Sequence, residues 1–333
     1  IILLASLFNS KARLWIKGRK GIFDKIQKQV KSDNNLVWFH TSSLGEFEQG
    51  RPLIEALKNK NKSVKILLTF FSPSGYENRK SYKTADYIFY LPPDTKKNAR
   101  QFINLIQPSK AFFIKYEFWY HYLNQLKKNN IPVYLISANF RNKQVFFKWY
   151  GGWFRKMLYK FAHVFVQNKK SEQLLKNIGL DNITISGDTR FDRVAEIAKQ
   201  AKRIEIAEKF KENSSLIIGG STWDKDEEII IEFINTSSLK TKYIIAPHEI
   251  HESNIQRIIK SINKPAIRYS SAGLSDVSNY QVLIIDNIGM LSSLYRYADI
   301  AYIGGGFGVG IHNILEAATF GLPVVFGPNY GKF

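Results

Sequence analysis

One pattern recurs along the chain, and it first appears in the segment Leu36-Val37-Trp38-Phe39-His40-Thr41-Ser42-Ser43-Leu44-Gly45-Glu46-Phe47-Glu48. Residues 36–40 form a short apolar run rich in β-formers, which predicts a buried strand. Small and polar residues then predict a tight loop, and the amphipathic stretch over 50–60 predicts a helix. Strand, loop and helix in this order are the unit from which parallel sheets are built.

Short apolar runs alternate with longer amphipathic stretches throughout the sequence. The first series of expected strands comprises residues 36–40, 64–69, 87–90, 111–114, 133–137, 164–167 and 183–186. A second series comprises residues 216–219, 242–246, 282–285, 300–303 and 324–326. Strand–helix alternation with short connections predicts parallel sheets covered on both faces, and so many strands suit two sheets better than one. We therefore expect an α/β protein with two Rossmann-like lobes.

The composition excludes several classes of protein. Of the 333 residues, 44% are hydrophobic and 23% are charged, which excludes a disordered chain. The sequence has no cysteine, so a disulfide scaffold, a thiolate metal site and a cysteine nucleophile are excluded. Lys and Arg number 48 against 28 Asp and Glu, a net charge of +20. This surplus points to a polyanionic partner: nucleic acid, an anionic membrane surface or a phosphorylated substrate.

The two ends of the chain and the segment 194–213 predict its organisation. The apolar run over residues 1–8 is shorter than the roughly 20 residues that span a bilayer, and a basic stretch with Trp15 follows it. We expect residues 1–20 to be the remnant of a membrane anchor with a basic juxtamembrane segment, or else an ordinary amphipathic first helix. The chain stops just after the strand at 324–326, so we expect a second lobe that is incomplete and a chain cut at both ends. The charged stretch 194–213 predicts a linker helix between domains at 21–193 and 214–333.

Ligands of such folds bind where strands end and loops lead into helices, so chemistry is expected there. Glu46 follows the first strand and Glu117 follows the strand at 111–114. A carboxylate at such a place can take a proton from a hydroxyl as a general base, or it can cap the next helix. Arg190, at the end of the first lobe, can stabilise phosphate charge or pair with Asp188 or Asp192.

The second lobe contains a glycine-rich loop, Gly304–Gly310, directly after the strand at 300–303. Its glycines permit close approach of a ligand to the backbone. A helix is expected to begin near residues 312–313, where its N-terminus would attract a phosphate, and Glu316 would then accept hydrogen bonds from ribose hydroxyls. The alternative is a glycine-rich turn that packs a helix on the sheet. His248 and Glu249 are metal-ligand types, but two such residues are weak evidence for a metal site.

A basic aromatic segment lies at residues 141–160. Trp and Phe side chains alternate there with Lys and Arg, a combination that suits contact with lipid headgroups and acyl chains. The same residue types stack on nucleic acid bases, so this segment does not separate the two partners.

Seven motifs occur in an order that resembles one family. They are Ser43-Leu44-Gly45-Glu46, Ser72-Pro73-Ser74-Gly75-Tyr76-Glu77, Glu117-Phe118-Trp119, Gly187-Asp188-Thr189-Arg190-Phe191-Asp192, Gly220-Ser221-Thr222, Ala246-Pro247 and His312-Asn313-Ile314-Leu315-Glu316. The sequence is similar to the 3-deoxy-D-manno-octulosonic acid (Kdo) transferases of lipopolysaccharide biosynthesis, which are inverting glycosyltransferases of the GT-B fold. The resemblance covers essentially the whole chain and implies two Rossmann-like lobes that face a central cleft.

The resemblance also implies a reaction and its residues. The donor would be CMP-Kdo and the acceptor a lipid A precursor, lipid IVA, at the cytoplasmic face of the bacterial inner membrane. Residues 21–193 would bind the acceptor, with Glu46 as general base and Glu117 and Arg190 stabilising the transition state. Residues 214–333 would bind CMP through Pro247, His248, Ile288, Gly289, Met290, Asn313, Ile314, Leu315 and Glu316. The partners implied are these substrates and the anionic membrane surface, with no nucleic acid, no cofactor and no metal.

Three positions depart from the family's pattern, and two other functions stay open. Arg190 stands where the family usually has Lys, His248 where it has Arg, and Met290 where Glu is common. One alternative is another GT-B glycosyltransferase or a sugar-nucleotide epimerase that uses a UDP-sugar, which donor preference would reveal. The other is a basic membrane- or RNA-binding protein without catalysis, for which Glu46→Gln would cause no loss of function.

Overall fold

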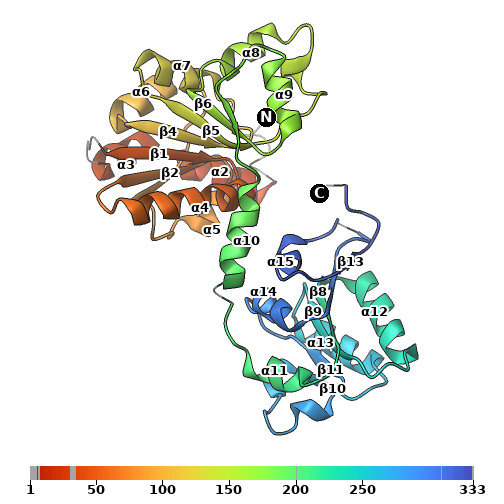
Figure 1. Cartoon of the computed structure of the whole chain (residues 1–333). Coiled ribbons are helices and arrows are strands. Elements are labelled where there is room, and N and C mark those ends of the chain that lie inside the picture. The colour runs from red at the N-terminus through yellow and green to blue at the C-terminus, as the bar shows by residue number, and fades with distance from the viewer. Residues whose placement is uncertain (1–5, 7, 31–34, 200, 309, 332–333) are drawn as a thin grey trace. The chain divides into compact units, whose positions relative to one another are not determined.

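The computed structural model describes residues 6, 8–30, 35–199, 201–308 and 310–331. The chain divides into two compact units, Ile1–Arg193 and Val194–Phe333, and each has its own parallel sheet (Figure 1). Apart from Ser6 and Phe8, the apolar run over residues 1–8 lies outside the described residues. The expectation of two Rossmann-like lobes with parallel sheets is confirmed.

The first unit contains a seven-stranded sheet in the order β3-β2-β1-β4-β5-β6-β7, and all neighbours are parallel. Its strands are β1 (Leu36–Thr41), β2 (Lys65–Phe70), β3 (Tyr87–Tyr90), β4 (Lys110–Ile114), β5 (Val133–Ala138), β6 (His163–Val166) and β7 (Ile183–Ile185). All seven expected strands are present, with ends that differ by one residue at most.

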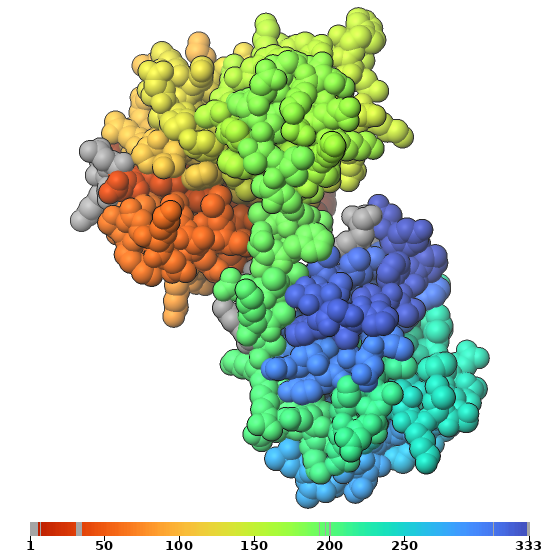
Figure 2. Space-filling view, in the orientation of Figure 1, coloured from red at the N-terminus to blue at the C-terminus, as the bar shows by residue number. Residues whose placement is uncertain are grey.

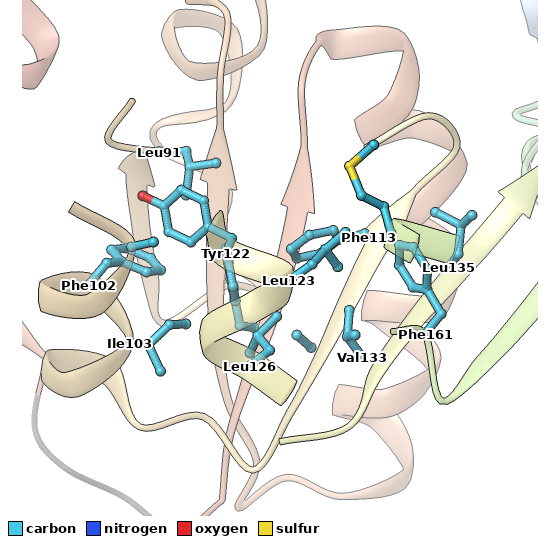
Figure 3. Packing of buried hydrophobic residues seen from close by; sticks show 14 of the residues in the cluster. Leu91, Phe102, Ile103, Phe113, Tyr122, Leu123, Leu126, Val133, Leu135 and Phe161 are labelled. Carbon is cyan, nitrogen blue, oxygen red and sulfur yellow. The ribbon is translucent and has the colours of Figure 1, made fainter. Parts of the chain in front are cut away.

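Helices cover both faces of this sheet. They are α2 (Ser10–Arg19), α3 (Ile22–Gln29), α4 (Leu44–Lys60), α5 (Pro73–Arg79), α6 (Lys96–Ile106), α7 (Tyr120–Lys128), α8 (Gly152–Leu158) and α9 (Lys169–Lys176), with a 3₁₀ turn at Val145–Phe147. The boundary between the two units falls within the next helix, α10 (Thr189–Lys199). Because side chains alternate across a strand, Leu36 and Trp38 of β1 pack with α3, α6 and α7, whereas Val37 and Phe39 pack with α4. Figure 3 shows Tyr122, Leu123 and Leu126 of α7 over the sheet residues Phe113, Val133 and Leu135. Each large apolar side chain buried this way contributes about 1.5–3 kcal/mol.

The second unit contains a six-stranded parallel sheet in the order β10-β11-β9-β8-β12-β13. Its strands are β8 (Leu216–Thr222), β9 (Lys242–Pro247), β10 (Ala266–Arg268), β11 (Val282–Ile284), β12 (Ile300–Ile303) and β13 (Val324–Phe326). Its helices are α11 (Glu205–Lys211), α12 (Asp224–Thr236), α13 (Glu252–Ser261), α14 (Leu291–Leu294) and α15 (Leu315–Ala318), with 3₁₀ turns at Tyr269–Ser271, Val277–Asn279 and Tyr295–Tyr297.

Two expectations for this unit need correction. Strand β10 was not predicted, because it has three residues, lies at the sheet edge and follows Pro265. The expected single linker helix at 194–213 is also wrong. The structure has α10, which begins earlier, and α11, whose Ala207 and Phe210 are fully buried in the core of the second unit. Part of this segment is therefore core and not linker.

Arg19, at the end of α2, is largely buried and connects this helix to the rest of the first unit. The guanidinium donates to the backbone carbonyls of Leu91 (2.8 Å), Phe71 (2.7 Å) and Trp15 (3.1 Å) and lies 3.9 Å from the Trp15 ring centroid. Burial lowers the pKa of Arg19 to about 10. Among the described residues, no helix is both long enough and apolar enough to cross a membrane.

Candidate active site

Glu46 lies in the first turn of α4, directly after β1. Its Oε2 accepts hydrogen bonds from the backbone N–H groups of Ser42 (2.6 Å) and Ser43 (3.1 Å), and Ser43 Oγ accepts from the Glu46 N–H at 3.5 Å. This is a capping box, so the structural role expected as an alternative for Glu46 is present. All the bonds to this carboxylate from described residues use Oε2. The cap therefore leaves Oε1 to receive a proton.

The surroundings of Glu46 make it a weaker acid. Burial, followed by the negative charge of Glu117, raises the pKa of Glu46 from its ordinary value of 4.5 to about 7. The two amides of the cap and the charge of Lys115 act in the opposite direction. A carboxylate that titrates near neutral pH has the proton affinity that a general base needs.

Glu117 follows β4 and is only 5% exposed. Its Oε2 accepts hydrogen bonds from Ser42 Oγ (2.8 Å), His40 Nε2 (2.9 Å) and Trp119 Nε1 (2.5 Å). Burial by itself raises the pKa of this carboxyl, but the hydrogen bonds from His40, Ser42 and Trp119 outweigh it, so the pKa of Glu117 lies below its ordinary value. The site thus holds one ionised carboxylate beside a second carboxyl of raised pKa, and Ser42 bonds to both.

Two cations belong to the same unit as these carboxylates. Lys115 has a left-handed backbone (φ 70°) at the end of β4, and burial and the charge of Arg190 lower its pKa. Arg190 Nε and Nη2 donate to Asp188 Oδ2 at 2.9 and 2.7 Å, which is the pairing considered as its structural role. The Arg190 side chain is 40% exposed, so its charge also faces solvent. Lys115 therefore interacts electrostatically with both Glu46 and Arg190, and Glu46 also interacts with Glu117.

The glycine-rich loop of the second unit follows β12, and close packing explains its glycines. A Cβ on Gly304 would come within 2.2 Å of the Ser221 carbonyl, one on Gly306 would come within 2.6 Å of Gly327, and Gly305 has φ +91°. The helix expected near residues 312–313 instead begins at Leu315 and has four residues. So short a helix has little macrodipole, and the expectation of a phosphate site at its N-terminus is not supported.

Asp226 ties this loop to the sheet. It lies in the first turn of α12 and is 1% exposed. Its carboxylate accepts hydrogen bonds from the backbone N–H of Gly305 (2.7 Å), the backbone N–H of Trp223 (3.0 Å) and the hydroxyl of Tyr302 (2.7 Å). Three donors satisfy this buried charge, so Asp226 fixes the loop that begins after β12.

Three aromatic rings stack beside the same loop. The Trp223 ring lies 4.4 Å from His248 and the His248 ring lies 4.8 Å from His312, with interplanar angles of 20° and 28°. Trp223 Nε1 donates to His312 Nε2 at 2.9 Å. Burial and the neighbouring His248 lower the pKa of His312. The stack is partly exposed and offers both a ring face and imidazole nitrogens to a ligand.

The structure brings together only some of the residues expected to bind a nucleotide. His248, directly after Pro247 at the end of β9, meets the segment that carries Asn313, Ile314, Leu315 and Glu316 through the His248–His312 stack. Asn313 Nδ2 donates to Glu316 Oε1 at 3.0 Å. Ile288 is 88% exposed. Gly289 and Met290 line a cavity of about 490 Å³ against α11, together with Tyr269 and Ser293.

Comparison with known proteins identifies the family. Residues 16–193, more than half of the chain, match the family model described as 3-Deoxy-D-manno-octulosonic-acid transferase (kdotransferase). The chain belongs to this family. Curated kdotransferases are similar over most of the chain: that of Rickettsia bellii is 28% identical over 316 residues (92% of this chain, 74% of the relative). The kdotransferase of Rickettsia prowazekii is 29% identical, and the match covers 90% of this chain and 66% of the relative. That of Aquifex aeolicus is 26% identical, and the match covers 91% of this chain and 78% of the relative.

Solved structures share the fold at low sequence identity. UDP-GlcNAc 2-epimerase from Neisseria meningitidis superposes with a TM-score of 0.56 at 15% identity and covers 87% of this chain and 81% of its own. The epimerase from Methanocaldococcus jannaschii gives a TM-score of 0.53 at 16% identity, covering 87% and 82%. These likenesses support the two-lobed GT-B fold of this kdotransferase, and they carry no inference about its substrate.

Several residues of the site were not predicted from the sequence. His40 and Trp119 bond to Glu117, Thr69 bonds to His40, and Asp226 holds the glycine-rich loop. One signal was available: His40 and Thr69 are polar residues inside otherwise apolar strands, and a buried polar group needs partners. The described residues contain no group of three or more His, Cys, Asp or Glu side chains that could hold a metal ion.

Proposed function

We propose that this kdotransferase transfers Kdo from CMP-Kdo to a hydroxyl of the lipid A precursor lipid IVA, with inversion and with Glu46 as general base. One observation carries the proposal: Glu46 lies at the carboxyl edge of the first sheet with a pKa raised to about 7 and with its cap bonds confined to Oε2. Family membership supports Kdo transfer in lipopolysaccharide biosynthesis. The identity of the acceptor, the inversion and the base are the parts that we propose.

The proposed step is a single displacement. Glu46 takes the proton of the acceptor hydroxyl as its oxygen forms a bond to the anomeric carbon of Kdo. The bond from that carbon to the phosphate oxygen of CMP breaks, and CMP leaves with the electron pair. Glu46 ends protonated and CMP carries the negative charge, so the charge balances. A base with a pKa near 7 accepts this proton and returns it to water at neutral pH.

We assign the stabilisation of the transition state to Glu117 and Arg190. Positive charge develops at the anomeric carbon as the bond to CMP weakens, and the ionised Glu117 carboxylate would stabilise it. Negative charge develops on the leaving phosphate, and the partly exposed Arg190 guanidinium would stabilise that. Because the leaving phosphate is a single one, we propose that cationic side chains neutralise it without a metal or other cofactor.

We propose that CMP binds at the second unit beside the aromatic stack. Pro247, His248 and the segment Asn313–Glu316 would contact it, and the ring faces of the stack suit a nucleobase. The turn Ile288–Met290 lies after β11, at the same carboxyl edge of the sheet as Pro247 and the glycine-rich loop. We assign this turn to the donor as well, where the cavity along α11 leaves room beside it.

We also propose that the protein works at the cytoplasmic face of the bacterial inner membrane, on its anionic surface. The segment around α8, which forms an outer surface of the first unit in Figure 2, exposes Trp149 (91%), Tyr150 and Trp153, with Arg155 and Lys156 on the same helix. Aromatic rings with adjacent cations suit the interface of an anionic bilayer. The basic residues of α2 add to this charge.

The test uses the full-length protein in detergent, with CMP-Kdo generated in situ and lipid IVA as acceptor. Mass spectrometry of the lipid measures the gain of Kdo units by the wild type and by Glu46→Gln. The side-chain amide oxygen of Glu46→Gln can still accept the capping bonds from Ser42 and Ser43, so the variant removes the base and keeps the cap. We expect turnover to fall by about a thousandfold. Glu228→Gln, at an exposed position of α12, is the matched control.

Three outcomes would contradict parts of this proposal. Full activity of Glu46→Gln would exclude Glu46 as the base. Transfer from a UDP-sugar in place of CMP-Kdo would favour another GT-B glycosyltransferase or an epimerase. A folded protein that neither binds CMP nor modifies the lipid would exclude the transferase and favour a binding protein.

A further inference from the structure

His40 is a histidine that the proposed step does not use, and its side chain has no exposed surface. It lies in β1, with Nδ1 2.8 Å from Thr69 Oγ1 of β2 and Nε2 2.9 Å from Glu117 Oε2. Since β1 lies between β2 and β4, one imidazole of β1 connects β2 to the segment that follows β4. A buried ring with a polar partner at each nitrogen has a fixed orientation and a defined proton position.

The donors around Thr69 decide which nitrogen of His40 carries the proton. Trp38 Nε1–H can only donate, and it lies 2.8 Å from Thr69 Oγ1, so this oxygen accepts there. The hydroxyl proton of Thr69 then has two acceptors in reach: His40 Nδ1 at 2.8 Å and the Phe39 carbonyl at 3.4 Å. The shorter contact makes Nδ1 the acceptor, and Nε2 therefore carries the hydrogen that is donated to Glu117.

Trp119 is compatible with this proton position. Its Nε1 lies 3.0 Å from His40 Nε2 and 2.5 Å from Glu117 Oε2. An indole carries a single N–H hydrogen, and the shorter contact directs that hydrogen to the carboxylate. Nε2 of His40 therefore keeps its own hydrogen for Glu117, and the carboxylate oxygen accepts from both rings.

We propose that His40 is a positioning residue, the third member of a donor chain Trp38–Thr69–His40 that ends on Glu117 and holds this carboxylate beside Glu46. This inference rests on the proposed function, because it explains how the general base acquires its neighbour. His40 touches neither of the proposed reacting atoms and acts through Glu117.

The charged groups around the pair come from several elements. Lys115 at the end of β4 acts on Glu46, and Lys115 is itself affected by Arg190 and Asp188 at the start of α10 and by Arg141 after β5. Only His40, Ser42 and Trp119 bond directly to Glu117 among the described residues. Of these three, His40 is the one that connects Glu117 to the neighbouring strands.

Loss of the His40 donor has a specific consequence. Without it, burial raises the pKa of Glu117, and this carboxyl takes a proton more readily. A neutral Glu117 no longer raises the pKa of Glu46, so the acidic limb of the pH profile of kcat moves to lower pH while the plateau falls. A histidine that only packed the core would change stability or kcat without moving that limb.

Two matched pairs of variants test the chain in the full-length protein. His40→Leu removes the donor at nearly constant volume, whereas His40→Gln places an amide N–H near the position of Nε2. Thr69→Val removes the hydroxyl, whereas Thr69→Ser keeps it. We expect kcat of H40L and T69V to fall by on the order of tenfold, with KM for the lipid nearly unchanged and with the acidic limb shifted down. H40Q and T69S should recover most of kcat and the wild-type limb.

A second readout does not depend on turnover. Imidazole ¹⁵N NMR of the wild type should show His40 as the Nε2–H tautomer, and the ¹³C signal of the Glu117 carboxyl should titrate at higher pH in H40L than in H40Q. An Nδ1–H tautomer, or a Glu117 titration equal in H40L and H40Q, would overturn the inference even if the enzyme is a Kdo transferase. If the wild type lacks Kdo transfer while the NMR results hold, the proposed function fails and the donor chain stands. Should H40L not fold, the tautomer and the T69V–T69S pair decide.

Discussion

Glu46 and Asp226 occupy the same local position in the two units. Each lies in the first turn of the helix that follows the strand where the sheet order reverses: β1 lies between β2 and β4, and β8 lies between β9 and β12. Each carboxylate accepts a backbone hydrogen bond from the residue before its helix, Ser43 at 3.1 Å and Trp223 at 3.0 Å. The local fold is thus the same, and such a switch point is where open α/β sheets bind ligands.

Contacts from distant parts of the chain make the two carboxylates different. Asp226 gains the Gly305 N–H and the Tyr302 hydroxyl, about eighty residues away, and becomes a clamp on the glycine-rich loop. Glu46 gains a like-charged neighbour, Glu117, seventy-one positions along the chain, and its cap bonds occupy only one of its oxygens. The contacts that a helix-capping acid makes beyond its own cap therefore decide whether it is structural or reactive. Burial, followed by the like charge of Glu117, makes Glu46 a base at a cost in stability.

The largest effect expected from this difference is on stability. The pKa of Glu46 is about 7 in the folded state and near 4.5 when unfolded, so its contribution to stability is present below pH 4.5 and is lost as pH rises through 7. Glu46→Gln removes this loss. We expect the variant to exceed the wild type in free energy of unfolding by about 2 kcal/mol at pH 8, with a gap that closes towards pH 4.5.

Urea unfolding at the two pH values measures this gap. Glu228→Gln, at its exposed position, should follow the wild type at both. A wild type whose stability parallels that of Glu46→Gln from pH 4.5 to 8 would show that Glu46 is not strained, and the contrast with Asp226 would fail.

The prediction of intermediate size concerns Asp226, the carboxylate compared with Glu46. Asp226→Ala removes Oδ2, the oxygen that accepts both backbone N–H groups, so the bonds from Gly305 and Trp223 are both lost. The loop should loosen, and we expect the affinity for CMP to fall by about tenfold, equivalent to about 1.4 kcal/mol. Titration calorimetry with CMP measures it. Asp224→Ala, at an exposed neighbouring position on α12, serves as the control, and equal affinities of the two variants would contradict the proposed clamp.

The sequence was sufficient for the local part of this architecture. Alternation of apolar runs predicted twelve of the thirteen strands in the described part of the chain, because buried parallel strands read as continuous hydrophobic segments. Glu46 was found because its loop and helix are contiguous with its strand. What the sequence could not show was pairing at a distance. Asp226 is a clamp only because Gly305 folds against it, and His40 acts on Glu117 only because β1 and β4 are neighbours.

Other errors have the same origin. The helix expected near residue 312 begins at Leu315, because the intervening backbone bonds elsewhere: the His312 N–H donates to Gly304 and the Ile311 N–H to Asn329. The burial of Arg19 against three backbone carbonyls likewise has no signal in the basic stretch that contains it. Spacing along the chain does not reveal such contacts.

The smallest expected effect concerns the protons of the second unit. Burial and His248 lower the pKa of His312, so His312 is neutral in the free protein at pH 7–8. A bound phosphate anion would raise that pKa, and binding should therefore take up a proton. We expect the CMP affinity of the wild type relative to His312→Gln to rise by about threefold from pH 8 to pH 6, because the ratio cancels the titration of CMP itself.

Comparison with His312→Gln distinguishes an imidazole that takes up a proton from one that contributes only its ring face. The side-chain amide oxygen of His312→Gln can still accept the bond from Trp223 Nε1, so the variant removes the titration and keeps the stack's hydrogen bond. His251→Asn, which retains a capping side chain for α13, is the control for an exposed histidine. Calorimetry in two buffers of different ionisation enthalpy reports the proton uptake directly. A ratio that does not change with pH would mean that His312 contributes a ring and no charge. His312 would then differ from Glu46 of the first unit, whose role depends on its titration.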